Sequence, residues 1–306
     1  MRGETLHDVV VIGAGAAGVS AAIECFDIQL DVVVIEAADK VGGQIDQVPH
    51  TVRNVAPAPD GNGALVDALA RHASVLGDRL VLDRAVTRLD LDTGRVDVGK
   101  RLFRARTVLV ATGSRRRELE NLPEGSIGGD VTYLVEPHMA RFAGDPMAVV
   151  GGGDSAVLDA LTLAAAGSPV TLVHRSPGLT ARPDLIDRVR SEDRITELAG
   201  WTLDKLVGSD RLEGLEVSDR TTGEHRRLEV GGVVLKLGRE QQVDLVRDQL
   251  ELGVRGGIAV DAHLRTSHPR TFAAGDVVED AYERIATAIG QGALAARTIL
   301  RYLESS

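Results

Sequence analysis

Two glycine-rich turns are the segments of this sequence whose residue types and spacing could bind nucleotide phosphates. Three small residues recur at one spacing in both turns: Gly13, Gly15 and Gly18 in the first, and Gly151, Gly153 and Ala156 in the second. In such a turn one glycine permits the sharp bend, the next lets the backbone approach a pyrophosphate, and the third small residue lets the helix pack on the strand. The helix N-terminus offers free N–H groups to the phosphates. We therefore expect two dinucleotide sites, with turn geometry alone as the alternative.

The residue that ends the next apolar run indicates which ribose each site would hold. After the first turn, "DVVVIE" ends on Glu36, whose carboxylate can accept hydrogen bonds from both hydroxyls of a ribose. After the second turn, "PVTLVHR" ends on His174 and Arg175, with no acidic residue. An imidazole and a guanidinium suit the 2′-phosphate of NADP. In the alternative reading Arg175 is a surface charge and His174 a hydrogen-bonded residue at the strand end.

The elements that must position these turns alternate between strands and helices, which predicts an α/β fold. We expect strands over 9–12, 31–36, 149–150 and 169–175, and helices over 17–27, 64–76, 155–166 and 284–303. Short segments between residues 80 and 104 indicate an antiparallel layer. The pattern restarts after Ser114, so the two halves look like repeats of one unit.

Composition narrows the class of protein. A length of 306 residues suggests about two domains, and 43% hydrophobic residues are ample for buried cores. A net charge of −10 argues against nucleic acid or an anionic membrane as the main partner. No secretory signal or membrane-spanning run is visible, so we expect a cytoplasmic protein. We expect no metal site. The basic run Arg115, Arg116 and Arg117 is expected to be a solvated loop.

Beyond the turns, the sequence resembles the thioredoxin-reductase-like flavoproteins over nearly its whole length. The matching segments are "VVIGAGAAGVSAA", "GGQI", "TVLVATGS", "AVVGGGDSAVLDA", "VTLVHR", "RTSHP", "TFAAGDV" and "ATAIGQGALAA". The resemblance implies two Rossmann-like dinucleotide-binding domains, with the NAD(P)-binding domain (115–239) inserted in a discontinuous FAD-binding domain (1–114 and 240–306). It also implies FAD and NADPH (or NADH) as cofactors, and a homodimer.

The resemblance also assigns cofactor-binding residues by position. For FAD these are Gly13, Gly15, Gly18, Glu36, Gly42, Gly43, Gln44, Asn54, Val86, Ala111, Thr112, Gly113, Gly275 and Asp276. Within that set, Val86 would meet the adenine through its backbone and Asp276 would hold the ribityl chain. For the nicotinamide dinucleotide they are Gly151, Gly153, Asp154, Ser155, Ala156, His174, Arg175 and Arg182.

The sequence departs from this family at the positions that carry its disulfide chemistry. Enzymatic members have a C-x-x-C before the second glycine turn, where Leu134 and Pro137 stand here. The one cysteine of the chain, Cys25, lies in a predicted helix and is expected to be a small buried hydrophobe. Dithiol–disulfide exchange needs an attacking and a resolving thiol, so we do not expect a thioredoxin reductase.

Two further departures concern proton transfer and the second nucleotide. His138 stands where the family has an acid, so it is a candidate proton donor or relay, with a surface residue as the alternative. Glu136 is a weaker candidate for the same role. Ser176 replaces the family's second arginine after the histidine, and the next basic residue is Arg182, which leaves NADH open beside NADPH. Glu283, Arg284 and Ile285 replace the family's Arg-Gln-Ala, so the contacts around the flavin ring are expected to differ.

These residues predict an FAD-dependent oxidoreductase that takes a hydride from NAD(P)H and passes the electrons directly to a non-disulfide acceptor. That acceptor could be a small molecule, oxygen or a quinone, or a ferredoxin. Ferredoxin is less favoured, because ferredoxin–NADP reductases of this kind usually extend past the last helix and this acidic chain would repel an acidic partner. One alternative is a flavin oxidase or dehydrogenase driven by its own substrate, with a vestigial nicotinamide site. The other is a non-catalytic, flavin-binding redox sensor.

Overall fold

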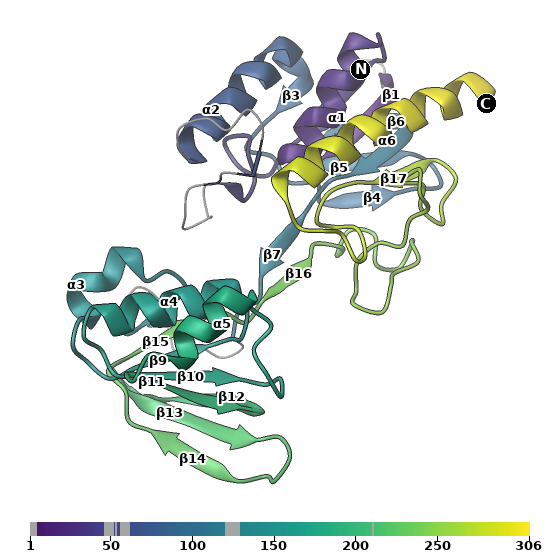
Figure 1. Cartoon of the computed structure of the whole chain (residues 1–306). Coiled ribbons are helices and arrows are strands. Elements are labelled where there is room, and N and C mark those ends of the chain that lie inside the picture. The colour runs from purple at the N-terminus through teal and green to yellow at the C-terminus, as the bar shows by residue number, and fades with distance from the viewer. Residues whose placement is uncertain (1–4, 46–51, 53, 56–61, 120–128, 210) are drawn as a thin grey trace. The chain divides into compact units, whose positions relative to one another are not determined.

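The computed structural model describes residues 5–45, 52, 54, 55, 62–119, 129–209 and 211–306. The chain divides into two compact units (Figure 1). Unit 1 comprises residues 1–115 and 239–306, and unit 2 comprises residues 116–238. The chain passes between the units twice, in strands β7 (Ser114–Arg116) and β16 (Arg239–Gln241), which pair as a two-stranded sheet.

Seven strands of the described residues form the main sheet of unit 1, in the order β3-β2-β1-β6-β5-β4 with β17 also paired to β6. Their bounds are β1 Leu6–Ile12, β2 Val32–Ile35, β3 Leu80–Val81, β4 Arg88–Asp90, β5 Arg95–Val98, β6 Arg101–Val110 and β17 Thr271–Ala273. The expected antiparallel layer is correct for β4, β5 and β6 but wrong for β3, which pairs parallel to β2. Its two residues are too few to show a pairing direction in the sequence.

Two helices of unit 1 pack so closely that the backbone of one contacts the backbone of the other. They are α1 (Ala16–Asp27) and α6 (Ile285–Ser305), and they lie side by side in Figure 1. A Cβ on Gly292 of α6 would lie 2.2 Å from the Ala17 carbonyl oxygen of α1, so only glycine fits there. A third helix, α2 (Asn62–Ala73), continues into a 3₁₀ segment, η2 (Ser74–Arg79). This packing presents the start of α1, and with it the first glycine turn, at the carboxyl edge of the sheet.

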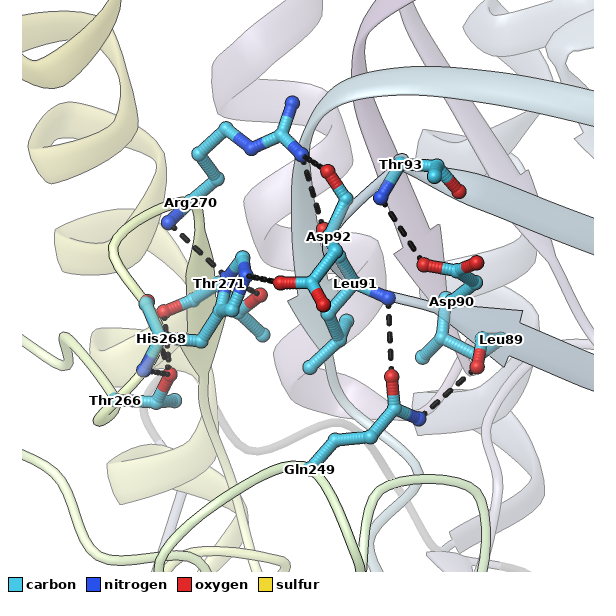
Figure 2. A network of polar contacts seen from close by, with 10 residues as sticks. All are labelled: Leu89, Asp90, Leu91, Asp92, Thr93, Gln249, Thr266, His268, Arg270 and Thr271. Atoms are coloured by element: carbon cyan, nitrogen blue, oxygen red, sulfur yellow. Dashed lines mark hydrogen bonds and ion pairs between the residues drawn. The ribbon is translucent and has the colours of Figure 1, made fainter.

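A polar network holds the hairpin between β4 and β5 against the segment that leads into β17 (Figure 2). The Gln249 side chain accepts from the Leu91 amide at 3.0 Å and donates to the Leu89 carbonyl at 2.9 Å. The Arg270 guanidinium donates to the Leu91 carbonyl at 3.0 Å and also to the carbonyl of Asp92. His268 lies 3.5 Å from the Asp92 carboxylate. The network thus anchors the chain just before β17 and the "AAGD" turn that follows.

Unit 2 is built on a parallel sheet with the order β11-β10-β9-β15-β8. Its strands are β8 Val131–Thr132, β9 Met147–Val150, β10 Val170–His174, β11 Ile195–Ala199 and β15 Gly232–Leu235. The helices are α4 Asp154–Ala165 and α5 Pro183–Arg190, preceded by η3 Glu136–His138 and α3 Met139–Phe142. An antiparallel meander of β12 Trp201–Gly208, β13 Leu212–Asp219 and β14 His225–Leu228 completes the unit. Buried side chains of α4 and α5 share a core with β9 and β10, and those of β12 and β13 share a second core.

The expectation of a solvated loop at Arg115 is wrong in its secondary structure, although the Arg115 side chain is exposed as expected. Arg115 lies in β7, where its guanidinium donates to Glu240 at 2.6 Å and to Asp244 at 2.8 Å. Both acceptors are distant in the sequence, so a local count of charges could not reveal them. No helix of the described residues is long and apolar enough to cross a membrane.

Candidate functional site

The first glycine turn has little space at two of its glycines and open space at the third. Gly13 has a φ of +104°, and a Cβ there would lie 2.4 Å from the Ala111 carbonyl oxygen. A Cβ on Gly18 would lie 1.9 Å from the Gly13 carbonyl oxygen. No described residue lies within 4 Å of a Cβ on Gly15, the residue that caps the N-terminus of helix α1. The turn therefore offers exposed backbone next to free volume, which a pyrophosphate needs.

Glu36 lies at the mouth of this turn. Its carboxylate accepts from the Ala14 amide at 2.6 Å through Oε2 and from the Ala38 amide at 2.8 Å through Oε1. Both donors are backbone N–H groups in the segments that follow β1 and β2. The Glu36 carboxylate is therefore held between the carboxyl ends of these two strands. The side chain is partly exposed, and carboxylate oxygens can accept hydrogen bonds from ribose hydroxyls.

Two other segments of unit 1, residues 42–44 and 111–114, lie beside the first glycine turn. Gly42 donates its amide to the Ala14 carbonyl at 2.9 Å, and a Cβ on Gly43 would lie 3.2 Å from the Gly15 Cα. The Gln44 side chain donates to the backbone carbonyl and the hydroxyl of Ser114. Of the other residues assigned to FAD, Ala111 lies against Gly13, and a Cβ on Gly113 would lie 3.5 Å from the Gln44 side-chain nitrogen. Val86 is partly buried, and Asn54 is exposed and hydrogen bonds to no described residue.

The turn after β17 completes this group. Gly275, with a φ of +82°, donates its amide to the Gln291 side chain of α6 at 2.7 Å. Burial raises the pKa of the next residue, Asp276, against the opposing effects of the Arg239 guanidinium and a hydrogen bond with Ser114. The Thr112 hydroxyl donates to the Gln242 carbonyl at 2.7 Å, and the Gln242 side-chain amide donates to the Thr112 carbonyl at 2.6 Å.

The residues of this edge fit a flavin dinucleotide. Gly15 leaves the volume that the pyrophosphate would fill, and Glu36 supplies the acceptor for a ribose. The sequence did not reveal the supporting residues Ser114, Arg239, Gln242 and Gln291, because each acts through a contact across the fold.

The second glycine turn, in unit 2, repeats this arrangement. Gly151 has a φ of +148°, and its Cβ would lie 2.5 Å from the Lys236 carbonyl oxygen. Gly153 is open, with its nearest neighbour, the Thr180 hydroxyl, 3.9 Å from a Cβ. Ala156 is buried in the first turn of α4, while Ser155 beside it is exposed. The turn can therefore receive a second pyrophosphate.

The three basic residues assigned to the nicotinamide dinucleotide lie in different environments. The His174 side chain is 2% exposed, and its Nε2 lies 2.9 Å from the Glu197 carboxylate of β11. The His174 side chain packs against Gly152, since a Cβ there would lie 3.3 Å from the His174 Cγ. The imidazole therefore packs against the backbone of the turn and does not face solvent. Arg175 is exposed and has no ion pair with any residue that the structure describes. Arg182 is held 3.5 Å from Asp154, whose carboxylate also accepts the Arg182 amide at 2.8 Å.

A buried ion pair that sequence reasoning missed lies beside the second turn. The Lys236 ammonium is 2.8 Å from the Asp159 carboxylate and donates to the Tyr133 carbonyl at 2.7 Å. Burial raises the pKa of Asp159, Lys236 opposes that rise, and the Glu136 charge adds to it. No motif signals this pair, because its partners come from α4 and from the chain just after β15 and β8.

His138 and Glu136, the candidate proton-transfer residues, both lie in η3 of unit 2. His138 is partly exposed, with its ring centroid 5.8 Å from that of Phe142. Glu136 is exposed. Their part in catalysis stays a prediction.

Cys25 is fully buried in α1, as the sequence predicted. Burial, with smaller contributions from Glu24 and Asp8, raises the pKa of its thiol to about 12. At pH 7 roughly one molecule in a hundred thousand would carry the reactive thiolate. We therefore expect the native protein to show no reaction with a thiol reagent such as dithionitrobenzoate, and the denatured protein to release one equivalent. Fast labelling of the native protein would contradict this.

Comparisons with known proteins find similar sequences and structures over nearly the whole chain. The sequence profile of the family described as pyridine nucleotide-disulphide oxidoreductase matches residues 7–292. A thioredoxin reductase of Mycolicibacterium smegmatis is 32% identical over 98% of this chain and 97% of its own length. The 34.2 kDa protein in the rubredoxin operon of Clostridium pasteurianum is 29% identical over 99% of both chains.

Solved structures give the same result. The thioredoxin reductase of Lactococcus lactis has a TM-score of 0.82 at 27% identity, covering 98% of this chain and 100% of its own. That of T. acidophilum has a TM-score of 0.80 at 26% identity, covering 99% of both. The predictions of a mixed α/β fold with two Rossmann-like domains, and of a thioredoxin-reductase-like flavoprotein, are confirmed.

Proposed function

Because the chain belongs to the pyridine nucleotide-disulphide oxidoreductase family, we propose that it is a flavoenzyme that passes electrons from NAD(P)H through FAD directly to a non-disulfide acceptor. One observation carries this proposal. The chain has two glycine turns with room for two pyrophosphates, at Gly15 and Gly153, and its single cysteine is the buried Cys25. Enzymes that reduce thioredoxin through their own disulfide need two accessible thiols. We therefore infer that this protein shares the cofactors of thioredoxin reductases but reduces a different electron acceptor.

We assign FAD to unit 1 and the nicotinamide dinucleotide to unit 2. In unit 1, Glu36 would accept the hydroxyls of a ribose and Asp276 would accept those of the ribityl chain. In unit 2, Arg175 is the exposed guanidinium suited to a 2′-phosphate. When bound, the flavin supplies the two-electron carrier that links hydride donor and acceptor.

The acceptor class is inferred from the missing disulfide. A quinone, oxygen or another small molecule needs protons as well as electrons, and His138 is the candidate donor because histidine is the side chain that most often transfers protons in catalysis. A small electron carrier is supported by the relative encoded in a rubredoxin operon. We also propose a cytoplasmic homodimer, by analogy with the family.

Anaerobic stopped-flow spectroscopy of the flavin-loaded protein tests this function. We expect NADPH or NADH to bleach the flavin absorbance rapidly, and a quinone, oxygen or a small electron carrier to restore it. Thioredoxin is the control and should not restore it. Bleaching by an organic substrate alone would favour a substrate-driven oxidase, and no bleaching with a tightly bound protein partner would favour a redox sensor.

A further inference from the structure

The strand order of unit 2 indicates where each half of a bound dinucleotide would lie. From β9 the chain runs to β10 and then β11 on one side, whereas β15 and β8 lie on the other side of β9. The order therefore reverses between β9 and β15, and dinucleotides bind across such a switch point at the carboxyl ends of the strands. The end of β10 carries His174 and Arg175, which mark the adenosine half. The nicotinamide half then falls over the ends of β15 and β8.

Lys236 lies at that position. It directly follows β15 and contacts the second glycine turn, since a Cβ on Gly151 would lie 2.8 Å from the Lys236 Cβ. Its ammonium forms an ion pair with the Asp159 carboxylate and donates a hydrogen bond to the carbonyl of Tyr133, which follows β8. The Lys236 side chain is 13% exposed and that of Asp159 is 7% exposed, so Lys236 is the more accessible side chain of the pair.

We propose that the Lys236 ammonium faces the nicotinamide half of the dinucleotide and, with Asp159, sets the relative affinity for its reduced and oxidised forms. This inference rests on the proposed use of NAD(P)H. The two forms differ in charge at one place: the dihydronicotinamide ring is neutral and the oxidised ring is a cation. An ammonium beside the ring disfavours the cation and leaves the neutral form unaffected. Lys236 therefore favours binding of NAD(P)H and release of NAD(P)⁺.

A purely structural role for the pair makes a different prediction. The ion pair also ties the loop after β8 to helix α4, so any disruption would weaken binding of both forms of the dinucleotide together. An electrostatic role changes the ratio of the two affinities instead. The sign of that change depends on which charge is removed, since Lys236→Gln leaves the Asp159 carboxylate alone and Asp159→Asn leaves the ammonium alone.

The test is isothermal titration of the flavin-loaded full chain with two ligands that cannot react with it. One is the oxidised dinucleotide, and the other is its tetrahydronicotinamide analogue, whose ring is neutral and donates no hydride. The measured quantity is the Kd of the oxidised form divided by the Kd of the analogue. We expect this ratio to fall about threefold or more in Lys236→Gln and to rise by a similar factor in Asp159→Asn.

Three controls make the result decisive. Lys205, an exposed lysine of β12 paired with Glu216, provides the matched variant Lys205→Gln, which should leave the ratio unchanged. Lys236→Arg keeps the charge and should stay near the wild-type ratio. Taking the ratio within each variant cancels any loss of folded protein. Equal shifts in both Kd values, or shifts of the ratio in one direction for both charge removals, would overturn the inference. A wild type that binds neither ligand would instead overturn the proposed function, and this inference with it.

Discussion

A Gly18→Ala variant is expected to lose its flavin and to lower the free energy of unfolding of unit 1 by about 1–3 kcal/mol. The added Cβ would lie 1.9 Å from the Gly13 carbonyl oxygen, a distance that requires the backbone of the turn or the start of α1 to move. That movement opens the close packing of helix on strand that holds the turn together. Urea unfolding followed by circular dichroism, with the ratio of flavin to protein absorbance, measures both effects.

The same substitution at Gly15 separates flavin binding from folding. Its Cβ would meet no atom within 4 Å in the part of the chain that the structure describes, and its φ of −71° is accessible to alanine. We expect the free energy of unfolding of the flavin-free protein to change by less than about 0.5 kcal/mol, as at other unobstructed sites. The methyl group would nevertheless occupy the volume proposed for the pyrophosphate, so flavin should be lost. A Gly15→Ala protein that retains its full flavin content would place the pyrophosphate elsewhere.

The second large effect is expected on removing one partner of the buried ion pair in unit 2. Lys236→Met leaves the Asp159 carboxylate buried without a counter-charge, which typically costs about 3–5 kcal/mol of stability. Replacing both residues, as Lys236→Met with Asp159→Leu, removes the unpaired charge and should recover most of that loss. Chemical denaturation of the single and double variants measures the difference, and an equal loss in both would contradict the explanation.

The Lys236→Met loss should also depend on pH. Burial already raises the pKa of Asp159, and Lys236 opposes that rise, so its removal raises the pKa further. A carboxyl whose folded pKa exceeds its unfolded pKa contributes most stability when protonated in both states, and that contribution is lost as the pH rises through the folded pKa. We therefore expect the variant to be closer to wild type at about pH 5 than at about pH 8. A loss that does not change with pH would mean that Asp159 stays ionised.

Local sequence determined the parts of this protein that are defined within a short window. The bend at Gly13, the open backbone at Gly15 and the carboxylate at Glu36 follow from steric limits on φ and from one strand-turn-helix repeat. The same reasoning predicted helix α1 over 17–27, one residue short of its observed start, because periodicity and small residues act between near neighbours. The single cysteine, Cys25, excluded an internal disulfide by count alone.

Tertiary structure alone decided which charges meet. His174 has the residue type that suits a phosphate, yet the fold buries it against Glu197 of the next strand. Lys236, Asp159 and Tyr133 are separated by long stretches of sequence and meet only because a parallel sheet brings the ends of β15 and β8 to the start of α4. The physical reason is the range of the forces involved. Backbone sterics and periodicity are encoded residue by residue, whereas desolvation and ion pairing depend on neighbours that exist only after the chain has folded back on itself.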